Sequence, residues 1–281
     1  MKILLAATFA SFGLAYPAMA QDTSDGSSAR DSWTGVYAGG RLGLSDLKDS
    51  GNERVLFDTN LDGTFGDTVR TAAGADAFSP GFCGGAAPGP RASQGCDTDS
   101  EETEWAVHAG FDYDLGGLVI GVLGEYGRGG PEDSVTAFST TPANYVLTRE
   151  LRESYGVRAR AGVDFGSTLI YATGGGVYGK FRNSFRSTNT ANAFAVTDGR
   201  QGEWGYRVGG GVEQRFGRHF SLGAQYLYTN IEDDRSGIQV TRGTAPATNP
   251  FVLTNANGTR FQRGNSDFET HNVSVTASFR F

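Results

Sequence analysis

Apolar and polar residues alternate strictly along the last nine positions of the chain. One face of this segment carries Val273, Val275, Ala277, Phe279 and Phe281, and the other carries Ser274, Thr276, Ser278 and Arg280. A period of two residues is that of a β-strand with one apolar and one polar face. Six further segments show this alternation, and a seventh, at 168–181, has an ambiguous register because three consecutive glycines at 174–176 break the pattern. The sequence therefore predicts eight strands, over residues 33–44, 104–115, 118–126, 155–165, 168–181, 204–215, 220–229 and 273–281.

The connections between these strands alternate in length. Three are short, at 116–117, 166–167 and 217–219, and four are long, at 46–103, 128–153, 183–202 and 233–266. An even number of amphipathic strands with this rhythm is typical of bacterial outer-membrane barrels. A sheet in hydrocarbon must also close on itself, because every backbone donor and acceptor has to pair internally. We therefore predict an all-β fold, an eight-stranded antiparallel up-and-down transmembrane β-barrel with long extracellular loops and short periplasmic turns.

A soluble lipocalin-type barrel is the alternative fold. It would turn its apolar face inward and would not need four long loops on one side. In a membrane barrel the apolar residues lie outside and the polar residues inside.

The first residues carry the features of a secretory signal peptide. A basic start at Lys2 precedes an apolar stretch, and Ala18-Met19-Ala20 forms a small-x-small cleavage site. We expect a signal peptide at 1–20, a periplasmic leader at 21–32 and a barrel at 33–281, in the outer membrane of a Gram-negative bacterium. Loss of Lys2 changes the formal charge from −7 to −8. This acidity argues against nucleic acid as a partner.

The first strand opens with the motif W-T-G-x-Y-x-G-G at residues 33–40, and the last strand ends on Phe281. These features resemble the small opacity-type (OmpA-like) porin family of Gram-negative outer membranes. The resemblance implies a structural, porin-like and non-enzymatic role in the envelope. It also implies that Phe279 and Phe281 are an assembly signal for the barrel-assembly machinery, and that outer-membrane lipid and lipopolysaccharide are partners. Trp33, at the start of the first strand, is expected at the membrane interface.

Charged residues gather on the polar faces of the predicted strands, where they would point into the lumen. They are Arg41, His108, Asp112, Glu125, Arg158, Arg160, Asp164, Arg207, Glu213 and Arg215. An eight-stranded barrel is just wide enough for side chains to fill. One interpretation is a plug of ion pairs that satisfies charges removed from water. The other is a narrow path for small solutes.

Two features stand out in the first long loop, at 46–103. Cys83 and Cys96 are the two cysteines of an exported chain, so they most simply form a disulfide. Closing a loop of this size stabilises by about 3 kcal/mol in the chain-entropy model.

The second feature of this loop is a D-x-N-x-D-G pattern similar to calcium-binding loops, with candidate oxygen ligands on Asp58, Asn60, Asp62, Thr64 and Asp67. The alternative is an Asp/Asn/Gly turn, because Val69 stands where a bidentate glutamate is expected. Calcium is the one cofactor that the sequence suggests.

Three other functions compete with the structural role. A surface adhesin or ligand-binding protein would use the loop at 46–103 to contact an extracellular ligand or a host surface. A narrow channel would use the lumen charges. A lipid A-modifying enzyme is suggested by His219-Phe220-Ser221 with Glu232 or Asp233. However, a strand of roughly 33 Å would separate that histidine from the carboxylates, which is too far for catalysis. We therefore predict a monomeric protein without enzyme activity.

Overall fold

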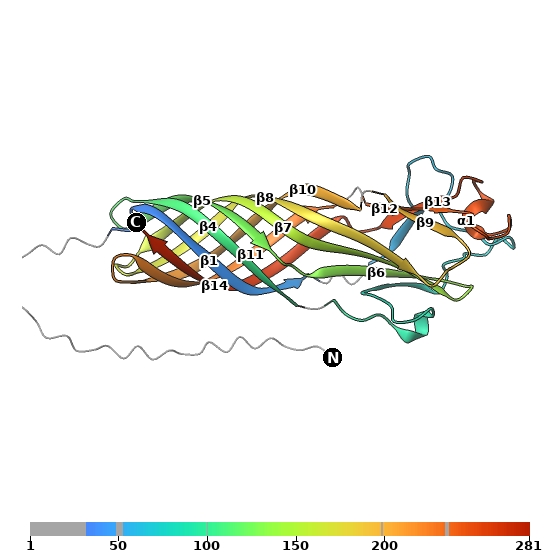
Figure 1. The fold of residues 1–281 in the computed structure, drawn as a ribbon, viewed down its shortest axis with the longest axis horizontal. Coiled ribbons are helices and arrows are strands. Elements are labelled where there is room, and N and C mark those ends of the chain that lie inside the picture. Colours follow the sequence, from blue (N-terminus) through green and yellow to red (C-terminus); the bar gives the residue numbers. More distant parts are fainter. Residues whose placement is uncertain (1–31, 49–52, 100, 198, 234–235) are drawn as a thin grey trace, which may run out of the picture. The chain divides into compact units, whose positions relative to one another are not determined.

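The computed structural model describes residues 32–48, 53–99, 101–197, 199–233 and 236–281 (Figure 1). The predicted signal peptide and all of the predicted leader except Ser32 lie outside these residues. Antiparallel strands make up most of the described chain. None of the helices found in this part of the chain is long and apolar enough to cross a membrane.

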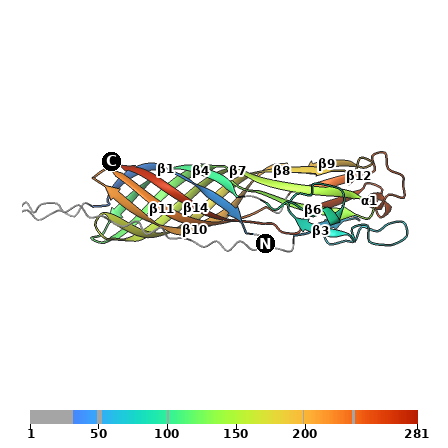
Figure 2. The ribbon, with the colours of Figure 1, turned by 90° about the horizontal axis from the view of Figure 1, so that it is seen from below.

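Eight strands close into a barrel. They are β1 (Gly35–Leu47), β4 (Glu102–Asp114), β5 (Leu118–Arg128), β7 (Ala143–Asp164), β8 (Thr168–Ser187), β10 (Arg200–Phe216), β11 (Phe220–Glu232) and β14 (Asp267–Arg280). Each pairs with its neighbours in this order, β7 pairs with β8, and β1 closes the ring against β14. Figures 1 and 2 show these strands running side by side around the barrel wall, tilted relative to its long axis. The predicted eight-stranded up-and-down barrel is confirmed.

The apolar face of the barrel points outward. Val157, Val273 and Val275 are each 64% exposed, whereas Tyr37 and Arg41 on the opposite face are buried. The soluble barrel considered above is therefore wrong, because it requires the reverse arrangement.

Exposed aromatic side chains mark both edges of this outer apolar band. Trp204 and Tyr206 lie near one end of β10, and Phe216 ends the same strand. The twelve residue-to-residue steps from Trp204 to Phe216 span about 40 Å along the strand, or about 30 Å in height after the usual tilt. That height suits an apolar band flanked by aromatic girdles.

The three short connections are tight turns, as predicted. Gly116 and Gly117 have φ values of +88° and +118°, and Gly166 and Gly217 have φ values of +82° and +71°. Residues with side chains rarely adopt this left-handed region, so glycine permits the reversals. We call this end of the barrel the turn end, and the opposite end the loop end.

The long connections are more ordered than predicted. They contain β2 (Val55–Asp58), β3 (Gly81–Gly84), a 3-10 turn (Ala92–Gln94), β6 (Glu132–Ser139), β9 (Ala193–Thr197), β12 (Gly237–Thr241), α1 (Pro250–Leu253) and β13 (Thr259–Arg263). The assignment of 128–153 and 183–202 to connections is wrong in part, because β7 starts at Ala143 and β8 continues to Ser187. The physical reason is a hairpin: β6 pairs with the first residues of β7 beyond the barrel rim.

Two sheets pack together at the loop end. One consists of β3, β6 and the distal parts of β7 and β8, and the other has the order β2-β13-β12-β9. Both contribute to one buried cluster, which includes Phe57, Val135, Tyr145, Val240 and Phe261. The rings of Phe57 and Phe78 lie 4.4 Å apart, and those of Phe78 and Tyr145 lie 5.2 Å apart. We call this folded unit, with its own hydrophobic core, the loop module.

Candidate functional site

The lumen contains two layers of ion pairs, and the first lies toward the loop end. Glu125 on β5 accepts a hydrogen bond of 2.8 Å from Arg158 on β7 and another from Arg207 on β10. Arg41 on β1 lies 3.7 Å from the same carboxylate and pairs directly with Glu104 on β4. One interconnected cluster of charges therefore joins five strands across the lumen.

The second layer lies toward the turn end. Arg160 donates to both Asp112, at 2.7 Å from Nε, and Glu213, at 2.9 Å from Nη1. Arg280 donates to the other oxygen of Asp112 at 2.7 Å. The Arg160 guanidinium also stacks over the Tyr37 ring at 4.5 Å. The layer therefore links β4, β7, β10 and β14.

The charges in the two layers almost balance. Five arginines, Arg41, Arg158, Arg160, Arg207 and Arg280, face four carboxylates, Glu104, Asp112, Glu125 and Glu213. All nine residues are less than 10% exposed. Such buried charges are tolerated when each has opposite charges and hydrogen bonds around it. The nine side chains therefore pair with one another across the lumen.

Inward-facing glycines make room for these long side chains. A Cβ on Gly121 would lie 2.1 Å from Oδ1 of Asp112, and a Cβ on Gly156 would lie 3.2 Å from the Glu125 carboxylate. Part of the high glycine content is therefore explained by the filled lumen.

The structure brings most of the predicted lumen residues together, but not all of them join the two layers. His108 contacts Ser278 at 3.0 Å, and Asp164 accepts from the Trp33 indole at 3.1 Å. Arg215 lies over the Trp33 ring at 4.5 Å. The list from the sequence omitted Glu104 and Arg280. Both residues lie on the polar faces of their predicted strands, and this position in the alternation could have identified them as lumen residues.

The expected position of Trp33 at the membrane interface is wrong. Its side chain is fully buried and packs inside the turn end with Val119, Leu169 and Tyr171. The buried indole N–H is satisfied by hydrogen bonds, because Asp164 and the Gly166 carbonyl both accept from it at 3.1 Å. The residue therefore closes the turn end instead of facing lipid.

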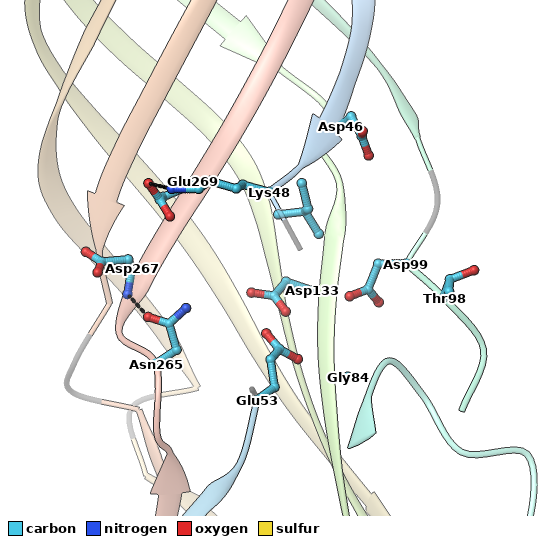
Figure 3. A pocket seen from close by; sticks show the side chains of 11 residues that line it. Asp46, Lys48, Glu53, Gly84, Thr98, Asp99, Asp133, Asn265, Asp267 and Glu269 are labelled. Atoms are coloured by element: carbon cyan, nitrogen blue, oxygen red, sulfur yellow. Dashed lines mark hydrogen bonds and ion pairs between the residues drawn. The ribbon is translucent and has the colours of Figure 1, made fainter. Parts of the chain in front are cut away.

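A cavity of about 340 Å³ lies where the barrel mouth meets the loop module (Figure 3). Six carboxylates line it, from Asp46, Glu53, Asp99, Asp133, Asp267 and Glu269, together with Lys48. Asp133 is held by Arg149 at 2.8 Å and by Arg263, which also binds Glu53 at 3.0 Å. The cavity is therefore acidic, with two arginines behind its wall.

The two carboxyls that share Arg263 differ in pKa. Burial, together with repulsion from Asp133, raises the pKa of Glu53 from its ordinary 4.5 to about 7. Burial also opposes ionisation of Asp133, but Arg263 and Arg149 outweigh it and lower the pKa of that carboxyl. Glu53 is therefore the group that changes charge near neutral pH.

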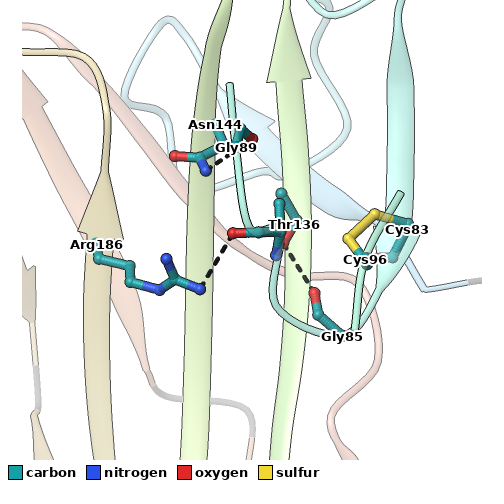
Figure 4. Close-up of a disulfide and its surroundings, with 8 residues drawn as sticks. Cys83, Gly85, Gly89, Cys96, Thr136, Asn144 and Arg186 are labelled. Atoms are coloured by element: carbon teal, nitrogen blue, oxygen red, sulfur yellow. Dashed lines mark hydrogen bonds between the residues drawn. A yellow bond between two sulfur atoms is a disulfide. The ribbon is translucent and has the colours of Figure 1, made fainter. Parts of the chain in front are cut away.

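The loop at 46–103 contains the predicted disulfide, Cys83–Cys96, with the Cα atoms 6.2 Å apart (Figure 4). The segment between the cysteines lies against the sheet. Thr136 donates to the Gly85 carbonyl at 2.8 Å, and Asn144 donates to the Gly89 carbonyl at 3.0 Å. Together with Arg186, which donates to the Ala87 carbonyl at 3.2 Å, these bonds fix the segment to β6, β7 and β8.

The candidate calcium residues form a hydrogen-bonded turn. Asp58 accepts from the amides of Asp62 at 3.2 Å and Gly63 at 3.0 Å. Asp62 accepts from the Thr64 amide at 2.7 Å, and Asn60 accepts from the Asp62 amide at 2.9 Å. Asp67 instead accepts hydrogen bonds from the amide and the hydroxyl of Thr59.

In the described part of the chain, no three His, Cys, Asp or Glu side chains are placed to hold a metal. The contacts match the turn interpretation, and calcium binding stays a prediction.

The suggested enzyme residues lie apart. His219 is in the turn-end connection, where its Nδ1 lies 2.9 Å from the Arg280 carbonyl oxygen and its ring stacks on Phe279. Glu232 ends β11 at the loop end, where its backbone lies opposite that of Asp267 in the register of β11 and β14. The structure does not bring these groups together.

A second cavity, of about 260 Å³, opens in the loop module. Its lining is entirely uncharged: aromatic rings from Phe78, Tyr145 and Phe251 face hydroxyls and amides such as those of Thr140 and Asn189. It combines an apolar floor with a few polar groups, as small-molecule sites commonly do.

Replacing Glu125 should destabilise the barrel strongly. Glu125→Gln leaves the surrounding arginines without their shared carboxylate, and breaking a buried pair of this kind costs about 3–5 kcal/mol. We expect the folded, heat-modifiable gel band to convert at a lower temperature. The matched control is Glu153→Gln, which removes the exposed ion pair with Lys180 and should change that temperature little. Equal conversion temperatures for wild type and Glu125→Gln would rule out the network's structural role.

The loop module should lose stability as pH rises from about 5 to about 7. The folded state keeps the Glu53 proton over this window while the unfolded state has lost it, so stability falls with rising pH. Protease resistance of the module, measured across this range, should show the decline in wild type and lack it in Glu53→Gln. Glu132→Gln, an exposed glutamate of β6, is the control. A wild-type module that gains resistance with rising pH would contradict the assignment.

The sequence of this chain matches one family of known proteins. The family described as "Outer membrane protein beta-barrel domain" matches residues 4–281. The 31 kDa outer-membrane immunogenic protein of Brucella melitensis is 26% identical over 233 residues, covering 81% of this chain and 84% of that protein. Among solved structures, OprG from Pseudomonas aeruginosa has 12% identity and a TM-score of 0.47, covering 88% of this chain and 97% of its own. Ail of Yersinia pestis, with a heparin analogue bound, has 10% identity and a TM-score of 0.33, covering 88% and 99%. The family match spans nearly the whole chain, so the chain belongs to the outer-membrane β-barrel proteins of Gram-negative bacteria.

Proposed function

We propose that this protein is a non-conducting, non-enzymatic outer-membrane anchor that presents the folded loop module outside the cell. The observation that carries this proposal is the continuity of β7 and β8. Both strands run from the ion-pair layers of the lumen into the sheet of the loop module. The module is therefore an extension of the barrel wall and not a set of separate loops.

The filled lumen supports the non-conducting part of the proposal. A solute path would need space along the axis, but the nine charged residues of the two layers are buried against one another. Because every one of these carboxylates accepts at least one hydrogen bond from an arginine of the two layers, moving an arginine aside would leave a carboxylate partner less satisfied.

A surface-binding role is the alternative, and it uses the same module. The loop at 46–103 supplies β2, β3 and the buried rings of Phe57 and Phe78 to the core. The uncharged cavity beside Phe78, Tyr145 and Phe251 is the place where this alternative would act. The anchoring role is common to both functions.

Cysteine labelling of intact cells tests the presentation of the module. Ala247→Cys introduces a thiol at an exposed position of the loop module, and Ser167→Cys introduces one in a turn-end connection. A membrane-impermeant maleimide should label Ala247→Cys on intact cells, and Ser167→Cys only after the outer membrane is permeabilised. The reverse pattern, or equal labelling of both on intact cells, would refute the proposed orientation.

A further inference from the structure

Four basic residues cluster on the outer wall of the barrel near the loop end. Arg152 comes from β7, Lys180 and Arg182 from β8, and Arg200 from β10. They line an open cavity of about 450 Å³ on the outside of these strands. We call this surface the basic rim. It contrasts with the acidic cavity inside the barrel mouth and with the net charge of −7 of the whole chain.

Two of the four cations already have carboxylate partners. Arg152 lies 2.5 Å from Glu150, and Lys180 lies 3.2 Å from Glu153. Within the described part of the chain, neither Arg182 nor Arg200 makes an ion pair or a side-chain hydrogen bond. After pairing, two guanidinium groups remain for an external anion.

Arg182 and Arg200 are direct cross-strand neighbours. Their Cα atoms are register partners between β8 and β10, and both side chains are exposed on the same outer face. Like charges directly opposite each other destabilise an antiparallel pair. A bound anion between the two would relieve this repulsion, and phosphate suits it, because guanidinium groups bind phosphate oxygens in a bidentate manner.

The height of the rim identifies the source of the anion. Tyr178 and Trp204 pair across the same two strands with their rings 5.1 Å apart, and Trp204 is 72% exposed. Aromatic girdles of this kind lie at the membrane interface. Lys180 and Arg182 follow Tyr178 by two and four residues, or about 7–13 Å along the strand. The rim therefore lies at the level of lipid headgroups, on the side that faces lipid.

We propose that the basic rim binds the phosphate of an outer-leaflet glycolipid, namely lipopolysaccharide. Arg182 and Arg200 hold one phosphate between them, Lys180 lies beside it, and Tyr178 and Trp204 support the lipid below. This inference rests on the outward orientation of the loop end in the proposed function. Failure of that orientation is detected separately, by the labelling of the cysteine variants.

The test measures lipid binding by the refolded full-length mature protein in non-ionic detergent. The probes are lipid A with both phosphates, the same lipid after removal of its phosphates, and inorganic phosphate. Wild type should bind the phosphorylated lipid best. The double variant Arg182→Gln/Arg200→Gln should bind it about ten- to a hundredfold more weakly, as expected for the loss of a charge-assisted hydrogen bond. Arg70→Gln/Arg260→Gln, which removes two exposed arginines of the loop module, should bind like wild type.

Thermal stability separates binding from a structural role of the two arginines. Without lipid, Arg182→Gln/Arg200→Gln should be at least as stable as wild type, because like-charge repulsion is removed. With phosphorylated lipid, wild type should become the more stable protein, since a ligand that binds the folded state stabilises it. Arg182→Lys/Arg200→Lys keeps the charge without the bidentate geometry and should show intermediate binding.

Three results would overturn the proposal. The first is equal binding of phosphorylated and dephosphorylated lipid by wild type. The second is unchanged affinity in Arg182→Gln/Arg200→Gln. The third is inorganic phosphate competing at concentrations similar to the lipid, which would make the rim a general anion site.

Discussion

The barrel depends on neutralising charge inside a wall that faces hydrocarbon. Glu125 is the clearest example, because its carboxylate accepts hydrogen bonds from Arg158 and Arg207 and lies close to Arg41. These residues come from four different strands. Closing the sheet pairs the backbone donors and acceptors, and the ion pairs neutralise the charged side chains that lie inside the closed barrel. The second layer, around Arg160 and Asp112, repeats the solution nearer the turn end.

The paired charges of the lumen bear on where the protein can act. The proposed closed lumen leaves the outer wall and the loop end as the surfaces that can meet other molecules. The loop end is built for this, because β7 and β8 continue beyond the barrel and form part of a module with its own core. The outer wall carries the apolar band, the aromatic girdles and the basic rim, which together match the layers of a membrane leaflet.

The sequence predicted the barrel because a period of two is a local signal. The alternation that puts Val275 outside and Ser274 inside needs no knowledge of the neighbouring strands. The same alternation placed Arg41, Glu125, Arg158 and Arg207 on polar faces.

Ion-pair partners could not be predicted in this way, because they depend on strand register and on contacts across the lumen. Arg207 meets Glu125 from a strand 82 residues away, and nothing in either segment specifies the other. The loop module was missed for a related reason. Its strands are short, and their pairing is distant in sequence, as for Phe57 with Phe261. The burial of Trp33 depends on the space left inside the turn end, which only the closed barrel defines.

Single-channel conductance of the purified, refolded mature protein tests the closed lumen most directly. Folding would be established beforehand by the heat-dependent shift of the gel band. The ion-pair layers predict a folded protein that gives no conductance steps in a planar bilayer. Reproducible steps from the same folded protein would contradict this account, because they would mean that Arg158, Arg160 and Glu125 line a water-filled path.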